Sequence, residues 1–144
     1  MKRFLLLMMA TLMMMACGQK TNAETAKEQR KQVKDYVEVI YFYGKQRCMT
    51  CRSIEKNAKQ LLDAKFAEQM KLGKVVWRVV DISKRENKAL AEKYEVSWSS
   101  LFVVQHNGSK ETAENLTEFA FSTSLRQADK FKADLAAKIN QLLY

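Results

Sequence analysis

The sequence of 144 residues contains no proline, and it contains only four glycines and one histidine. A cis peptide bond is nearly free only before proline, because the cis form of any other peptide bond costs about 2.5–4 kcal/mol. The missing proline therefore excludes a cis-proline turn, and any other cis bond would need its cost offset by neighbouring interactions.

Nitrogen and sulfur ligands for metal ions are also scarce. Structural zinc sites and iron–sulfur clusters are held by three or four such ligands, whereas this chain has three cysteines and His106. Cys17 is assigned to another role below, which leaves two thiols and one histidine expected at the far end of a strand. These could serve only two-coordinate copper(I) or a copper or iron site shared between chains. We therefore expect no bound metal and no cofactor.

Long apolar segments are absent as well. The apolar run Phe4–Ala16 has 13 residues, fewer than the ~17–25 that a membrane-spanning helix needs. Lys2 and Arg3 precede the run and small residues end it, an order that is typical of a secretory signal peptide. Cys17 follows immediately, and in this the chain resembles bacterial lipoprotein signals, whose cysteine becomes the lipidated first residue of the exported protein.

The lipoprotein resemblance implies how the chain is divided. Residues 1–16 form the signal peptide, residues 17–34 a polar tether, and residues 35–144 one folded domain. The lipid on Cys17 would hold the protein in the bacterial cell envelope, at the periplasmic face or on the outer membrane. Export would place the two remaining cysteines in an oxidising compartment, where disulfides persist. An uncleaved anchor and an ordinary signal with a chance cysteine are the alternatives.

The formal net charge of +9 does not indicate a nucleic-acid partner. Lysine and glutamate are mixed through the expected helices, and no basic block is interleaved with aromatic residues, whereas a nucleic-acid footprint clusters on one face or groove. We interpret the charge as a contribution to solubility and to attraction toward anionic membrane surfaces.

Hydrophobic patterns predict alternating strands and helices. Runs rich in aromatic and β-branched residues predict strands at Tyr36–Tyr43, Val75–Ile82 and Leu101–His106, with a fourth inside Ser109–Leu116. Apolar residues at steps of three and four predict a helix over Met49–Leu72. Two capping boxes, Ser83 with Glu86 and Ser124 with Gln127, predict the starts of a short helix and of a long C-terminal helix.

The order of these elements predicts the fold class. The strand–helix–strand opening implies parallel pairing through a right-handed crossover, and Asn107–Gly108 predicts a tight hairpin that adds antiparallel strands. We therefore expect an α/β domain with a four-stranded mixed sheet sandwiched by helices.

Cys48 and Cys51 form a CxxC motif where the first predicted strand leads into the first predicted helix. A CxxC at this place resembles the thioredoxin-like redox arrangement, over Tyr36–Leu143. A second match, Tyr94–Gly108, resembles the thioredoxin segment that passes through the loop facing the active site into a strand and its Asn-Gly turn. The stretch YFYGKQRCMTCRSIEK is similar to small exported thioredoxin-like proteins of gut bacteria that are labelled nitrophenyl-compound nitroreductase subunits.

The thioredoxin-like resemblance implies a thiol–disulfide oxidoreductase that acts on protein or small-molecule thiols and disulfides. Cys48 is the expected nucleophile, because the unpaired N–H groups and the dipole at a helix N-terminus favour a thiolate. Lys45, Arg47 and Arg52 are expected to add positive charge nearby. Cys51, one turn further along the helix, is the expected resolving thiol.

The chain departs from thioredoxins in the loop that should face the disulfide. Where thioredoxins have a cis-proline, the ungapped match places Ser100, and we expect the Ser99–Ser100 bond to be trans. Trp98 in the same loop is expected either to line a groove or simply to pack. No tryptophan precedes the first cysteine, and no buried acid is evident in the first strand, where Glu38 is the only acid between residues 36 and 43.

Other interpretations of the cysteine pair stay open at this point. The pair could be structural, or it could bind copper or iron. The domain could also be a non-catalytic thioredoxin-like binding module, such as an accessory subunit of a reductase, that uses the groove near Trp98 and Ser100. His106, beside the predicted turn, is interpreted as an exposed hairpin residue rather than as a catalytic base.

The lipoprotein resemblance generates the first prediction. A labelled fatty acid should enter the wild-type protein in a bacterial host, and Cys17→Ser should abolish the labelling, because the thioether forms on that sulfur. Incorporation is measured by gel autoradiography of the purified chain. Labelling that persists in Cys17→Ser would contradict the lipid assignment.

Overall fold

The structure, a computed structural model, describes residues 35–144. The expected signal peptide, the lipidation residue Cys17 and the expected tether to residue 34 lie outside the described residues, so these assignments stay predictions. No helix among residues 35–144 is both long and apolar enough to cross a membrane.

Four strands form one mixed sheet. In sequence order they are β1 (Asp35–Tyr43), β2 (Val75–Asp81), β3 (Ser100–Asn107) and β4 (Lys110–Asn115), and in the sheet they follow the order β2-β1-β3-β4. The β1–β2 pair is parallel, and the β1–β3 and β3–β4 pairs are antiparallel. The predicted parallel pairing of the first two strands and the predicted hairpin at Asn107–Gly108 are therefore both confirmed.

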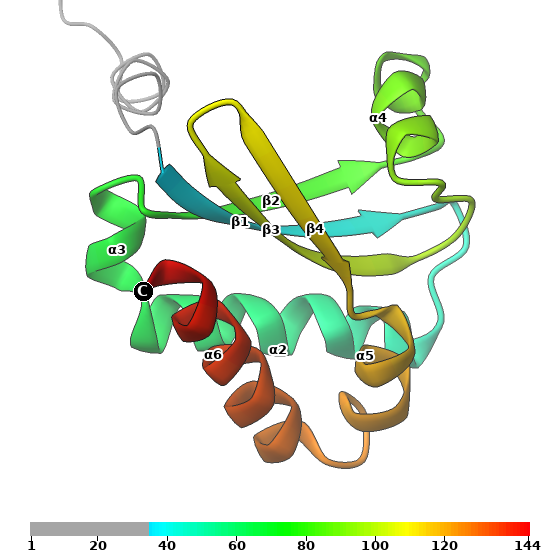
Figure 1. Cartoon of the computed structure of the whole chain (residues 1–144). Coiled ribbons are helices and arrows are strands. Elements are labelled where there is room, and N and C mark those ends of the chain that lie inside the picture. The colour runs from blue at the N-terminus through cyan, green and yellow to red at the C-terminus, as the bar shows by residue number, and fades with distance from the viewer. Residues whose placement is uncertain (1–34) are drawn as a thin grey trace, which may run out of the picture.

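Helices cover the two faces of the sheet unequally. Figure 1 shows α2, α3, α5 and α6 below the sheet and α4 above it, near the end where β1 stops. Their bounds are α2 Met49–Lys65, α3 Ala67–Lys71, α4 Lys88–Lys93, α5 Thr117–Thr123 and α6 Ala128–Leu143, and a short 3-10 turn at Arg85–Asn87 precedes α4. The predicted α/β class, with a four-stranded mixed sheet sandwiched by helices, is confirmed.

The core divides along strand β1. Val37, Val39 and Tyr41 point toward α2 and α6 and belong to the larger apolar cluster. Ile40 and Phe42 point the other way, into a smaller cluster under α4. Both faces are buried because successive side chains of a strand alternate between its faces, so β1 is a central strand.

Helix α2 presents one apolar stripe to this core. Ile54, Ala58, Leu61 and Leu62 recur at helical spacing and are buried, which accounts for the predicted helix. The prediction that this helix continues to Leu72 is wrong, however. Phe66 leaves helical geometry with φ −123° and ψ 16° and is itself buried in the core. Its anchoring separates α2 from the short helix α3.

Neither predicted capping box forms. The Ser83 backbone N–H and hydroxyl both donate to the Asp81 carboxylate, at 3.0 and 2.7 Å, and these hydrogen bonds lower the pKa of Asp81. Helix α4 begins after Asn87 without a side-chain cap, and α6 begins after Gln127 without one. Ser124 instead ends α5, a helix that the sequence patterns did not reveal.

Glu95, just after α4, provides a stability test of this fold. It is exposed and has φ 53°, in the left-handed region that costs a residue with a Cβ about 1–2 kcal/mol. Glu95→Gly should remove this strain, partly offset by the ~0.4–1 kcal/mol of extra unfolded-state entropy of glycine. Urea unfolding should show a net gain of ~0.5–1 kcal/mol.

Glu92→Gly is the matched control for this stability test. Glu92 is an exposed glutamate inside α4, where glycine destabilises a helix by about 1 kcal/mol. If both substitutions lowered the free energy of unfolding, Glu95 would not be strained.

Candidate active site

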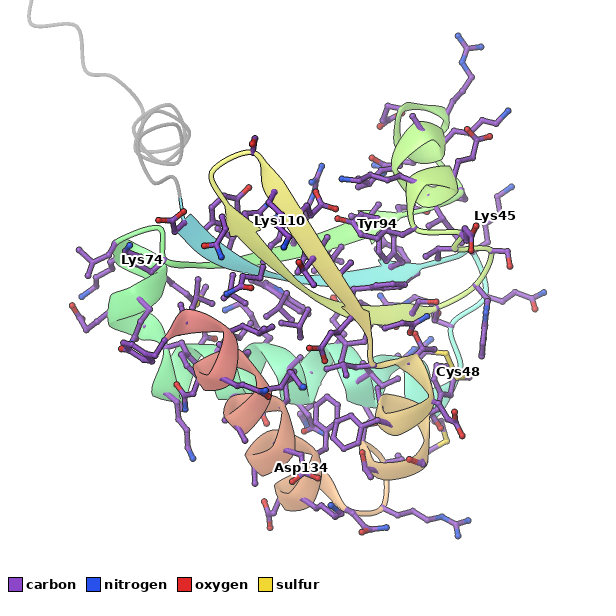
Figure 2. The ribbon with its side chains drawn as sticks, viewed as in Figure 1. Lys45, Cys48, Lys74, Tyr94, Lys110 and Asp134 are labelled. Carbon is purple, nitrogen blue, oxygen red and sulfur yellow. A yellow bond between two sulfur atoms is a disulfide. The ribbon has the colours of Figure 1, made fainter. Side chains whose placement is uncertain are left out.

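The cysteine pair lies where the central strand leads into the longest helix. Strand β1 ends at Tyr43, a short loop follows, and α2 begins at Met49, directly after Cys48. Figure 2 shows Cys48 and Lys45 at the same end of the molecule, away from Lys74 and Lys110. The loop before Cys48 is thus held between two buried elements, which fixes where the first sulfur emerges.

Cys48 is the N-cap residue of α2. Its backbone is extended, with φ −69° and ψ 169°, and its Sγ accepts a hydrogen bond of 3.0 Å from the backbone N–H of Cys51. The first N–H groups of a helix have no partner within the helix and carry a partial positive charge. The first turn of α2 contains no acidic residue. This environment favours a negative charge on Cys48 Sγ.

Cys48 and Cys51 form a disulfide, and they differ in exposure. Their Cα atoms are 5.0 Å apart, within the range that a disulfide accepts. Cys48 is exposed at the surface, whereas Cys51 is only 6% exposed. An attacking molecule can therefore reach Cys48 Sγ directly, whereas the buried Cys51 Sγ is accessible to Cys48 Sγ.

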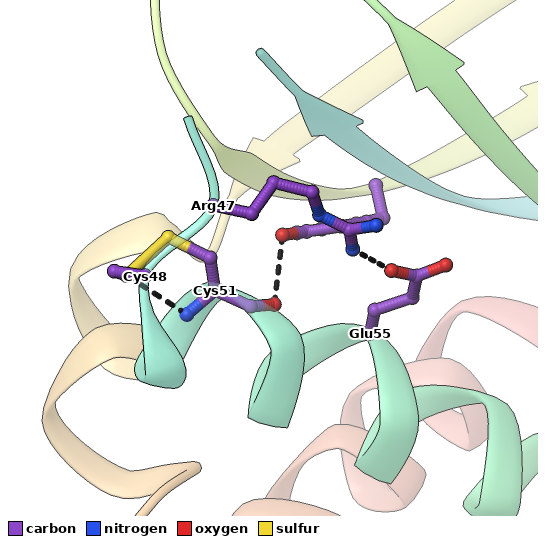
Figure 3. Close-up of a disulfide and its surroundings, with 5 residues drawn as sticks. Arg47, Cys48, Cys51 and Glu55 are labelled. Carbon is purple, nitrogen blue, oxygen red and sulfur yellow. Dashed lines mark hydrogen bonds and ion pairs between the residues drawn. A yellow bond between two sulfur atoms is a disulfide. The ribbon is translucent and has the colours of Figure 1, made fainter. Parts of the chain in front are cut away.

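Tyr41 supports the motif from below. Its ring is fully buried in strand β1, and its hydroxyl donates a 2.7 Å hydrogen bond to the backbone carbonyl of Cys51. The bond joins the central strand to the first turn of α2, as Figure 3 shows. Nothing in the local sequence indicated it, because the two residues are ten positions apart and the contact depends on the packing of α2 against β1.

Arg47 is one of the three expected tuning cations, and it pairs with Glu55 of α2. Its guanidinium lies 4.5 Å from the ring centre of Tyr43 and 5.8 Å from that of Tyr41. In Figure 3 the Arg47 side chain extends away from the disulfide toward Glu55. Glu55 follows Arg47 by eight positions, a spacing at which no local sequence pattern indicates a pair.

The other two cations, Lys45 and Arg52, are exposed. Within residues 35–144 neither forms an ion pair with a carboxylate. Lys45 is close enough to Asp81 to contribute, after the Ser83 hydrogen bonds, to the lowered pKa of that carboxyl. The effect of the three cations on Cys48 stays a prediction.

The loop before β3 adjoins the same end of the sheet. Ser100 pairs with Phe42 near the end of β1, and both Ser99 and Ser100 are buried, at 6% and 4% exposure. The Ser100 hydroxyl donates to the Trp98 carbonyl at 3.1 Å. None of the described peptide bonds is cis, so the Ser99–Ser100 bond is trans as predicted.

Trp98 is 59% exposed, and its ring packs 5.3 Å from that of Phe121 in α5. The two rings line an open groove of about 750 Å³ together with Asn115, Thr117, Glu118 and Ser122. Helix α5 lies beside the start of α2, because the Ser124 carbonyl accepts hydrogen bonds from Ser53 and Asn57. Trp98 therefore both packs against Phe121 and lines this groove, and the expectation that the groove faces the cysteines stays a prediction. Phe121 was not predicted from the sequence, because its contact with Trp98 depends on the packing of α5.

The interpretation of His106 as an exposed hairpin residue is wrong. Its side chain is 17% exposed, its Nε2 lies 3.2 Å from a Glu38 carboxylate oxygen, and its ring stacks on Tyr36 at 4.2 Å. Glu38 also contacts Arg78 at 3.5 Å, and at 7% exposure it is a buried acid, so the expectation that the first strand contains none is wrong. Because His106 pairs with Tyr36 near the start of β1, this cluster lies at the opposite end of the strand from Cys48.

Metal ligands do not gather in the part of the chain that the structure describes. Among residues 35–144, no group of three or more histidine, cysteine, aspartate or glutamate side chains is placed to hold an ion.

Comparison with known proteins gives the fold a name. No family model and no curated protein matches the sequence. Among solved structures, an uncharacterised thioredoxin-like protein from Clostridium perfringens shares 16% identity, with a TM-score of 0.50 over 77% of this chain and 74% of that one. The fold is therefore thioredoxin-like, as the CxxC context had indicated.

Two thioredoxins are similar at slightly lower scores. Thioredoxin-2, described as a component of the malaria parasite protein secretion machinery, shares 21% identity, with a TM-score of 0.49 over 76% of this chain and 85% of that one. Fasciola hepatica thioredoxin shares 18% identity, with a TM-score of 0.47 over 83% and 89% of the two chains.

The unequal exposure of the two cysteines generates a prediction. In the reduced protein, iodoacetamide should modify Cys48 faster than Cys51, and the rate at Cys48 should rise with pH around a midpoint below the ~8.5 of a free cysteine. Cys48→Ser and Cys51→Ser, each combined with Cys17→Ser, leave one thiol apiece for the measurement. Faster modification of Cys51 would show that the roles are reversed.

Proposed function

We propose that this chain is a membrane-tethered thiol–disulfide oxidoreductase that uses the Cys48/Cys51 couple. The observation that carries the proposal is the position of Cys48, an exposed N-cap whose sulfur accepts the Cys51 N–H. A thiolate is the attacking species in disulfide exchange, and this position stabilises one. The thioredoxin-like fold and the disulfide between the two residues support the proposal.

The exchange takes place in two displacements. The Cys48 thiolate attacks one sulfur of a substrate disulfide, which breaks that bond, forms a mixed disulfide and releases a substrate thiolate that takes up a proton. Cys51, having lost its proton, then attacks Cys48 Sγ, forms the intramolecular disulfide and releases the second substrate thiolate. The substrate gains two electrons and the CxxC loses two. The same steps in reverse oxidise a substrate dithiol.

The groove beside Trp98 favours a protein substrate over a small thiol alone. Trp98 and Phe121 offer an apolar surface, and Met49, inside the motif, is 76% exposed. Exposed large apolar side chains are typical of surfaces that bind another chain, and we propose that such a chain would contact both the groove and Met49. A binding module without exchange activity is the second candidate, because the same groove could hold a partner.

Lipid attachment at Cys17 would set the location of this activity. The charged, apolar and small-residue order of residues 1–16 supports export, and lipid attached to Cys17 would keep the domain at the bacterial envelope membrane. The finer resemblance to proteins labelled nitroreductase subunits adds no activity to this proposal, since the chemistry of the described site is that of two thiols.

Trapping with a defined disulfide peptide tests the exchange. Wild-type protein should reduce the disulfide of this peptide in the presence of a thiol donor, and either cysteine-to-serine substitution should abolish the reaction. Cys51→Ser should accumulate a mixed disulfide through Cys48, because the resolving thiol is gone, whereas Cys48→Ser should accumulate none. Mass spectrometry measures the adduct. Full exchange activity in both variants, or none in the reduced wild type, would contradict the proposal.

Trp98→Ala separates the oxidoreductase from the binding module. In an oxidoreductase that uses the groove, KM for the protein disulfide should rise several-fold while the rate with glutathione disulfide stays unchanged. Leu72→Ala is the control, since Leu72 is 67% exposed and lies next to Lys74 at the far end of the molecule. Binding of a partner without any thiol exchange would favour the module.

A further inference from the structure

The ion pair between Arg47 and Glu55 joins the loop before the CxxC to the second turn of α2. Both side chains are partly shielded, at 26% and 31% exposure. The guanidinium rests near the rings of Tyr43 and Tyr41, 4.5 and 5.8 Å from their centres, and its Nε is buried without a hydrogen-bond partner. A charge pair held against aromatic rings is screened less by solvent than an exposed pair.

The same cluster touches the backbone of the redox motif. Tyr41, beneath the guanidinium, donates its hydroxyl hydrogen to the Cys51 carbonyl at 2.7 Å. Arg47 itself is the residue immediately before Cys48. Figure 3 shows these groups together: the Arg47 side chain passes beside the Cys51 turn and ends at Glu55. The pair therefore lies beside the motif on its α2 side.

The negative charge of Glu55 neutralises the positive charge of Arg47, which the sequence alone predicts beside Cys48. Without a partner, Arg47 would be a full cation next to the attacking sulfur. The first turn of α2 has no acidic residue. The carboxylate that pairs with Arg47 is therefore that of Glu55, in the second turn. Lys45 and Arg52 have no ion-pair partner among residues 35–144.

We propose that Glu55 is a positioning residue that acts through Arg47 to set how easily the Cys48–Cys51 disulfide is reduced. The inference rests on the proposed function in that this disulfide is the redox couple. Glu55 touches neither sulfur, so it acts by holding the Arg47 side chain away from Cys48 and by neutralising its charge there.

An electrostatic role of this kind has a distinctive signature. The reduced motif carries a thiolate on Cys48, and a positive charge nearby stabilises that form. Loss of the Glu55 charge leaves Arg47 uncompensated and should favour the dithiol. Loss of the Arg47 charge leaves Glu55 uncompensated and should favour the disulfide. A purely structural clamp would instead shift both variants in the same direction, because either change breaks the same contact.

Equilibration of the full chain with glutathione buffers tests this inference. The fraction of Cys48–Cys51 disulfide is measured by acid quenching and thiol labelling across a range of glutathione ratios. Glu55→Gln should shift the equilibrium toward the dithiol by ~3-fold, and Arg47→Met toward the disulfide by a similar factor, a magnitude typical of one unit charge that is partly screened by solvent. The double variant should return close to wild type.

A second ion pair on the same helix supplies the control. Lys59 and Asp63 of α2 form an exposed pair, two turns or more beyond the motif, so Asp63→Asn should leave the equilibrium unchanged. The pH dependence of Cys48 alkylation gives a second measurement, and its midpoint should move down in Glu55→Gln and up in Arg47→Met. Circular dichroism of each variant verifies that the fold is retained.

The outcomes distinguish this inference from the proposed function. Shifts of the two single variants in the same direction, or a Glu55→Gln equilibrium no different from that of Asp63→Asn, would overturn the role of Glu55 while leaving the oxidoreductase proposal intact. If the Cys48–Cys51 pair of the wild-type protein did not exchange with glutathione at any of the ratios tested, the proposed function and this inference would both be overturned.

Discussion

Burial of strand β1 on both of its faces is the constraint on which the rest of the structure depends. Val39, Ile40, Tyr41 and Phe42 are all fully buried, although successive side chains enter opposite clusters. Burial of each such side chain is worth about 1.5–3 kcal/mol, and a slip by one position would exchange the two sets between differently shaped clusters. The register of β1 is therefore fixed, and with it the point at which the chain leaves the sheet toward Cys48.

Opposing charges at this exit point determine the chemistry that the motif can support. The start of α2 offers unpaired N–H groups, one of which bonds to Cys48 Sγ, and this contribution comes from backbone geometry alone. Arg47 would add to it, but its pair with Glu55 balances that charge. The helix terminus is thus a fixed source of stabilisation, whereas the ion pair is one that a single substitution can change in either direction.

The two ends of the sheet have separate roles. The disulfide and the trans bond at Ser99–Ser100 lie at one end, and Trp98, just before that bond, lines a groove together with residues of α5. At the other end the buried Glu38 pairs with the partly buried His106. A buried charge needs partners to offset its desolvation, and Glu38 has His106 and Arg78 as partners. This cluster lies near the start of β1, too far from Cys48 for Glu38 to carry a proton there.

The sequence by itself determined the strands, the hairpin, the fold class and the position of the CxxC at a strand–helix junction, because these depend on local patterns of apolar residues, turn residues and cysteines. It did not reveal the break at Phe66, the helix α5 or the loss of both capping boxes, since tertiary packing and the Asp81 carboxylate compete with local preferences there. Only the tertiary structure decided the partners of Arg47, Tyr41 and His106. Each contact joins residues eight or more positions apart, and such contacts form only when helix and strand are packed together.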